Sequence, residues 1–200
     1  METKSVGILL FDDVGVLDFA GPFEVLSIAA FKDSENIKPF KVETVSETGE
    51  LIAARNGLQV LPSYSFENAP VFDILIIPGG PGARLTELHN DKLIEWIKKQ
   101  DKSTELTTSV CTGALLLAKA GLLDGKKATT HWASYDRLAE LFPKVDVVKG
   151  VKFVDEGRIV TSGGISAGIT MAFHLVERLV GPEEKATAAK RMEYDLLENT

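Results

Sequence analysis

The sequence predicts an α/β sandwich with a mostly parallel central sheet. Short β-rich runs alternate with longer helical patterns through most of the 200 residues, which is typical of βα units around a parallel sheet. Several β-rich runs are almost unbroken apolar stretches, as in strands that are covered on both faces. The length suits about one domain of roughly 150 residues, and no repeat or low-complexity linker interrupts it. We therefore expect one domain over residues 1–200.

The first half of the chain alternates buried strands with a helix. The expected elements are strands at 6–11, 40–46 and 72–77, a helix at 19–31, and a small hairpin or excursion at 57–63. Pro22 is tolerable in the predicted helix if it lies in the first turn. The strand at 72–77 runs into the loop PGGPG, whose glycines favour a sharp turn.

The second half continues the alternation. The expected elements are helices at 91–99, 112–123, 135–142, 167–181 and 182–195, a strand at 106–110, a short β segment at 127–132, and further strands within 145–162. Apolar residues at helical spacing indicate the first of these helices. Gly121 is expected to end the second, and Ser134 is a reasonable N-cap for the third. The turn Asp155-Glu156-Gly157 predicts a hairpin.

Composition excludes several classes of protein. Hydrophobic residues make up 44% and charged residues 26% of the chain, so neither a disordered chain nor a small disulfide scaffold is expected. The 22 Lys and Arg against 29 Asp and Glu leave a net charge of −7, which disfavours binding to nucleic acid or acidic membranes. No apolar run reaches the ~18 residues of a membrane span, and the N-terminus lacks a signal-peptide cleavage site. We predict a cytoplasmic protein.

Metal binding is also unexpected from the sequence. The chain has one cysteine, Cys111, which excludes an intrachain disulfide and a multi-cysteine metal centre. No two of the three histidines share a ligand spacing. We predict no metal, and Cys111 would act as a single thiol.

Candidate site residues follow the predicted strands, and ligands of open α/β sheets bind outside the carboxyl ends of the strands. The residues at these ends are Asp18, Gly79, Gly80, Cys111, His131 and Gly164. They offer a carboxylate, closely approachable backbone, a thiol and an imidazole to one rim of the sheet.

Cys111 is the strongest candidate. A strand that runs straight into a cysteine, then Thr-Gly-Ala and a helix, resembles a nucleophile elbow. A thiol at a helix N-terminus is expected to have a lowered pKa and a larger thiolate fraction. The alternative is that Cys111 is a small buried hydrophobic residue.

Asp18 has two interpretations. An acid at the start of a helix is ordinarily an N-cap. Beside a thiolate in a partly dry pocket its pKa would be raised, so that it holds a proton near neutrality and acts as a general acid. Glu24, further along the same segment, is expected to be a solvated or capping carboxylate.

The glycine loop and His131 also allow two interpretations each. Gly79 and Gly80 could simply form a turn, or their backbone N–H groups could approach a developing anion as an oxyanion hole. His131 could pair with Cys111 as in other thiol enzymes. A satisfied core or rim histidine is slightly favoured for it.

The segment SVCTGALLLAKAGLLDGKKATTHW resembles the ThiJ/PfpI superfamily, a flavodoxin-like group related to class I glutamine amidotransferases. Three further segments resemble its isonitrile hydratase branch. They are LLFDDVGVLDFAGPFEVL, FDILIIPGGPG and GRIVTSGGISAGITMAFHLVERLVG. Together the four segments cover nearly the whole chain in the same order.

The resemblance implies a cofactor-free lyase, usually a homodimer, that hydrates a small isocyanide to an N-substituted formamide. Cys111 would attack the terminal isocyanide carbon. Asp18 would protonate that carbon and then help water to attack the resulting thioimidate. Thr112 would orient the site through its backbone and hydroxyl, and Gly79 and Gly80 would form the neighbouring wall.

This sequence differs from other branches of the superfamily at positions that distinguish one activity from another. PfpI-type peptidases have a histidine where this chain has Thr112, and glutamine amidotransferases have a glycine where it has Ser109. Chaperone and glyoxalase-like branches use a glutamate in the first loop, where this chain offers Asp18. Related transcription regulators carry a helix-turn-helix extension, whereas this sequence ends at Thr200.

Other functions based on the same thiol stay open. One is a non-catalytic sensor, in which Cys111 is oxidised to a sulfinate or binds a metabolite. Another is a glyoxalase-like enzyme acting on small aldehydes.

Overall fold

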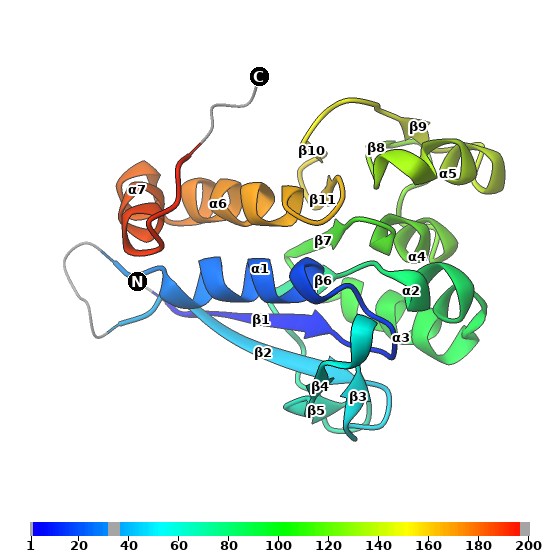
Figure 1. Ribbon diagram of the computed structural model, residues 1–200, viewed down its shortest axis with the longest axis horizontal. Helices are drawn as coiled ribbons and strands as arrows, with labels where there is room; N and C mark the ends of the chain where they lie inside the picture. The colour runs from blue at the N-terminus through cyan, green and yellow to red at the C-terminus, as the bar shows by residue number, and fades with distance from the viewer. Residues whose placement is uncertain (1, 32–36, 197–200) are drawn as a thin grey trace.

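The computed structural model describes residues 2–31 and 37–196, and its centre is a sheet of order β10-β11-β7-β6-β1-β2-β5 (Figure 1). Neighbouring strands are parallel except β10 and β11, which pair antiparallel. The strands are β1 (Lys4–Leu9), β2 (Phe40–Ser46), β5 (Tyr64–Ser65), β6 (Ile74–Ile77), β7 (Leu106–Val110), β10 (Phe153–Asp155) and β11 (Ile159–Ser162). The predicted mostly parallel α/β sheet is confirmed.

The α-helices cover this sheet in two groups. They are α1 (Val16–Ile28), α2 (Pro81–Leu85), α3 (Asp91–Asp101), α4 (Gly113–Lys119), α5 (Tyr135–Leu141), α6 (Ala167–Leu179) and α7 (Pro182–Arg191). Helices α1, α6 and α7 pack against one another, and α2, α3 and α5 each contact α4 (Figure 1). None of the described helices is long and apolar enough to cross a membrane.

Two strand pairs lie outside the central sheet. Strands β3 (Ile52–Ala53) and β4 (Gln59–Val60) pair antiparallel, which confirms the small hairpin or excursion predicted near this position. Strands β8 (Lys127–Ala128) and β9 (Asp146–Val147) pair parallel. The β segment predicted at 127–132 is thus only two residues long and does not join the main sheet.

Buried strands at the centre of the sheet determine where the site lies. All four residues of β6 and all five of β7 are buried. The apolar run of β6 predicts this for a strand covered on both faces, whereas β7 buries three polar residues, Thr107, Thr108 and Ser109. From the middle of the sheet the chain winds outward in two directions, from β1 to β2 and from β6 through β7 to β11. The direction reverses between β1 and β6, and such a switch point is where ligands of open α/β sheets bind.

Helix α1 begins earlier than predicted, at Val16. Pro22 therefore lies inside the helix and not in its first turn. Because proline has no backbone N–H, Pro22 cannot donate a helical hydrogen bond at this position. The capping residue is Gly15, which has no side chain to signal a helix start. The loop PGGPG also ends sooner than expected, because Pro81 begins the short helix α2, a position that suits its fixed φ.

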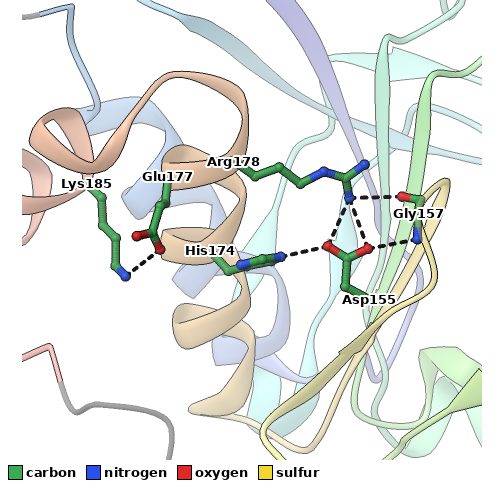
Figure 2. A network of polar contacts seen from close by, with 6 residues as sticks. All are labelled: Asp155, Gly157, His174, Glu177, Arg178 and Lys185. Carbon is green, nitrogen blue, oxygen red and sulfur yellow. Dashed lines mark hydrogen bonds and ion pairs between the residues drawn. The ribbon is translucent and has the colours of Figure 1, made fainter.

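A cluster of charged side chains ties the hairpin of β10 and β11 to helix α6 (Figure 2). Asp155 lies 2.8 Å from His174 Nε2 and 3.0 Å from Arg178 Nη1, both on α6. Along the same helix Glu177 pairs with Lys185 of α7 at 2.7 Å. The antiparallel pairing of β10 with β11 confirms the hairpin predicted at Asp155, and the contacts of Asp155 hold that hairpin against α6.

Candidate active site

Cys111 lies in a sharp turn between strand β7 and helix α4. Its φ is 57°, a left-handed conformation that costs about 1 kcal/mol or more for a residue with a side chain. The turn is held from both sides: the Cys111 N–H donates to the carbonyls of Ser162 (3.2 Å) and Gly163 (3.0 Å), and Thr130 Oγ1 donates to the Cys111 carbonyl at 2.7 Å. The local geometry is that of the predicted elbow.

Glycines let this elbow approach the end of β6. A Cβ on Gly113 would collide with the carbonyl oxygen of Ile77. A Cβ on Gly79 would lie 2.6 Å from Thr112 Oγ1 and 2.9 Å from Cys111 Cβ. The loop after β6 therefore lies directly against the cysteine and the residue that follows it.

Asp18 lies in the first turn of α1 and is only 2% exposed. Its carboxylate accepts hydrogen bonds from the backbone N–H of Gly79 (3.2 Å to Oδ2) and Ile165, and from the thiol of Cys111. Burial raises its pKa from 3.8 to about 6, although these hydrogen bonds oppose the rise. Since Gly15 occupies the N-cap position, the capping interpretation of Asp18 is wrong.

The pKa of Cys111 moves in the direction opposite to the prediction. Burial, followed by the negative charge of Asp18, raises it from 9.0 to about 12. Hydrogen bonds from the backbone and side chain of Thr112 lower it, but they do not compensate. At neutral pH the sulfur therefore keeps its proton and donates it to Asp18, which is itself only about one-tenth protonated at pH 7.

Thr112 joins the glycine loop to the sulfur. Its Oγ1 accepts the N–H of Gly80 at 2.9 Å and lies 3.2 Å from the Gly80 carbonyl. The same hydroxyl contacts the sulfur of Cys111. With one proton to donate, it can bond either to the carbonyl or to a thiolate.

The predicted oxyanion hole of Gly79 and Gly80 is not present in this geometry. The Gly79 N–H is donated to Asp18 and the Gly80 N–H to Thr112. Because each N–H group already has a partner, neither is open to a developing oxyanion. The two glycines instead position the acid and the hydroxyl.

A cavity of about 340 Å³ opens beside these residues. Asp18, Cys111, Thr112, Gly80 and His131 line it, and Gly79 and Gly164 do not. The structure thus brings the main predicted residues to one place.

His131 lines this cavity without pairing with the thiol. Among the described hydrogen bonds none joins it to Cys111, and its Nδ1 accepts the backbone N–H of Ala133 at 3.3 Å. Burial, then the charge of Arg84, lowers its pKa, so the ring is neutral at physiological pH. A Cβ on Gly164 would collide with this ring, so Gly164 leaves room for His131.

Sequence reasoning missed four contributions to the site. Ile165 has a φ of 56° and offers its backbone N–H to Asp18, a role that no side chain signals. Arg55, Arg84 and Arg137 also line the cavity. They come from three separate segments and form no motif in the sequence.

Comparison with known proteins shows the family and the fold of this chain. The sequence profile of the DJ-1/PfpI family matches residues 4–178. The chain belongs to the DJ-1/PfpI family. A solved ThiJ/PfpI family protein from Pseudomonas syringae superposes with a TM-score of 0.87 and 26% identity, over 98% of this chain and 76% of that one. The resemblance predicted from the sequence is confirmed.

Members of the DJ-1/PfpI family similar to this chain differ in function. Isonitrile hydratase of Pseudomonas putida is 37% identical over 191 residues, 94% of this chain and 78% of the relative. The HTH-type transcriptional regulator GbdR of Pseudomonas aeruginosa is 31% identical over 98% of this chain, which spans 52% of the regulator. Glutathione-independent glyoxalase DJR-1.2 of Caenorhabditis elegans is 30% identical over 70% of this chain and 74% of the relative.

Proposed function

We propose that this protein is a cofactor-independent hydratase that converts an isocyanide to an N-substituted formamide through a covalent thioimidate on Cys111. The observation that carries the proposal is a protonated thiol hydrogen-bonded to a buried carboxylate beside a cavity of about 340 Å³. The 37% identity with isonitrile hydratase of Pseudomonas putida supports the substrate class.

The first half of the reaction moves one proton from sulfur to carbon. Asp18 takes the proton of the Cys111 thiol as the sulfur attacks the terminal isocyanide carbon and forms the C–S bond. The carbon is left with an electron pair, and Asp18 returns the proton to it. The product is the thioimidate R–N=CH–S–Cys111, with Asp18 ionised again and ready to act as a base.

The second half adds water to the thioimidate. Asp18 removes a proton from water as its oxygen bonds to the carbon, and this proton is then delivered to the nitrogen. The tetrahedral adduct R–NH–CH(OH)–S–Cys111 collapses when the C–S bond breaks. The hydroxyl proton returns to sulfur, which releases R–NH–CHO and regenerates the thiol.

The backbone around the site favours this chemistry over reaction with a carbonyl group. Attack on an aldehyde or acyl group develops charge on oxygen, which open N–H donors must stabilise. The N–H groups of Gly79 and Gly80 are engaged by Asp18 and Thr112. Attack on an isocyanide develops charge on carbon, where a proton from Asp18 neutralises it.

The thiol pKa argues against the sensor alternative. Oxidation to sulfenic and sulfinic acid proceeds through the thiolate. With its pKa at about 12, Cys111 has a very small thiolate fraction until a substrate accepts the shared proton.

Turnover of a para-substituted phenyl isocyanide by purified wild-type protein and Cys111→Ala tests the proposal. Formamide is followed by absorbance and mass spectrometry, and the protein mass is checked for the adduct. We expect multiple turnovers that vanish in Cys111→Ala, with the fold intact by circular dichroism. Absence of isocyanide turnover, together with consumption of methylglyoxal or an oxidised Cys111, would overturn it. The homodimer and the cytoplasmic location remain predictions.

A further inference from the structure

Three arginines surround the cavity that contains Cys111. Arg55 lies in the turn after β3, Arg84 on α2 and Arg137 on α5, and all three line the cavity. The whole chain has six arginines and a net charge of −7. Half of the arginines of an acidic protein therefore converge on one small pocket.

These three arginines have no carboxylate partner within ion-pair distance in the described part of the chain. Elsewhere arginine is paired: Arg158 with Asp101 and Arg178 with Asp155, each at 3.0 Å. Figure 2 shows the second of these pairs. The contrast indicates that the arginine charges at the cavity are available to bind a ligand.

Two of the three arginines are joined by a hydrogen bond. Arg137 Nη2 donates to the backbone carbonyl of Arg84 at 2.9 Å, so the Arg137 side chain reaches from α5 to the main chain of α2, and both residues line the cavity. Like charges on one wall repel unless an anion lies between them. The only acidic residue of the described lining is Asp18, whose carboxylate is already committed to Gly79, Ile165 and Cys111.

We infer that the substrate is an isocyanide that carries a carboxylate, held by Arg84 and Arg137 while its N≡C end faces Cys111. The planar guanidinium fork matches a carboxylate with two parallel hydrogen bonds. A cleft lined by one sign of charge also concentrates ligands of the opposite sign. This inference rests on the proposed function and specifies its substrate class.

A pair of substrates that differ in charge tests the inference. The kcat/KM of wild-type protein is measured for para-isocyanobenzoate and for its neutral methyl ester, and the ratio acid to ester is taken. The double variant Arg84→Gln/Arg137→Gln removes both of these cations and leaves Arg55, whose charge acts on Asp18. Lys119→Gln removes an exposed cation outside the lining and is the charge-matched control.

We expect the ratio to fall by about tenfold or more in the double variant, from the loss of charged hydrogen bonds, and to stay at the wild-type value in Lys119→Gln. Raising the salt to ~0.5 M should reduce the wild-type ratio, because partly exposed charges are screened. The same ratio in all three proteins would overturn the inference even if both substrates are hydrated.

Binding without turnover separates this inference from the proposed function. Calorimetry compares benzoate with benzamide, its neutral analogue, on the wild-type protein and on the double variant. A preference for benzoate that disappears in the double variant supports the anion site even where no isocyanide is hydrated. Equal binding of the two ligands to the wild-type protein would overturn it.

Discussion

Replacing Asp18 with asparagine should change the pH dependence of stability by an amount that the structure specifies. The carboxyl is 2% exposed and burial raises its pKa from 3.8 to about 6. At about 1.4 kcal/mol for each pH unit, the ionised form is disfavoured by about 3 kcal/mol in the folded chain. Because the pKa of Asp18 is higher in the folded chain than in the unfolded chain, the unfolded chain loses the Asp18 proton at a lower pH. Wild-type stability therefore falls as pH rises from 3.8 to about 6, and the full penalty remains above that range.

The asparagine side chain carries no charge and escapes this penalty. Relative to the wild type, Asp18→Asn should be more stable at pH 8 than at pH 4 by about 2 to 3 kcal/mol. The free energy of unfolding is measured in urea for both proteins at both pH values. The difference in free energy of unfolding between variant and wild type is taken at each pH, and the value at pH 4 is subtracted from the value at pH 8. This subtraction cancels the contribution of the hydrogen bonds that the amide loses, about 1 kcal/mol each, and the contribution of other titrating groups.

Glu24→Gln removes an exposed carboxylate of the same helix and serves as the control. If the stability of Asp18→Asn relative to the wild type were the same at pH 4 and pH 8, that result would refute the conclusion that burial holds the pKa of Asp18 near 6.

Three further predictions concern the same site. Burial and the charge of Asp18 raise the pKa of Cys111 to about 12, so Cys111 should react with iodoacetamide at pH 7 far more slowly than free cysteine. Asp18→Asn should speed the reaction, and rapid labelling of the wild type would contradict this prediction. Thr112→Val keeps the shape but loses the hydroxyl that contacts the sulfur, so kcat for isocyanide hydration should fall roughly tenfold, and an unchanged kcat would exclude a role for that hydroxyl. Ile165→Gly relieves a β-branched residue at φ 56° and should raise the free energy of unfolding by about 1 kcal/mol in urea titrations, whereas a lower value would show that the turn is not strained.

The sequence predicted the order and type of the main strands well. The strands expected at 40–46 and 106–110 match β2 and β7 residue for residue, whereas the apolar runs at 6–11 and 72–77 overlap β1 and β6 without sharing both ends, because an apolar run does not mark where strand pairing begins or stops. Prediction failed where the signal lies in the backbone. Gly15 caps α1 without a side chain, so the helix start, and with it the position of Pro22, could not be placed.

The sequence indicated three residues of the candidate site but not its electrostatics. Strand ends and the elbow pattern pointed to Cys111, Asp18 and Thr112, and the fold brings all three together. The direction of the thiol pKa depends on how deeply the sulfur is buried and on how closely Asp18 approaches it. Both follow from tertiary packing, which spacing along the chain does not reveal. The same is true of the Gly79 N–H, whose partner is 61 residues away.

The raised thiol pKa is compatible with nucleophilic catalysis because Cys111 and Asp18 act as a pair. Between pH 6 and pH 12 the pair holds one proton, and the structure places it on sulfur. A cysteine with a low pKa would have given this proton to solvent, and the acid would then have none to transfer to carbon. Here the proton leaves sulfur only through Asp18, so the thiolate forms beside the acid that must next protonate the substrate. Hydration should accordingly require ionised Asp18, and its rate should fall as pH is lowered through about 6. A rate that stays constant down to pH 4 would mean that the thiol proton leaves by another route.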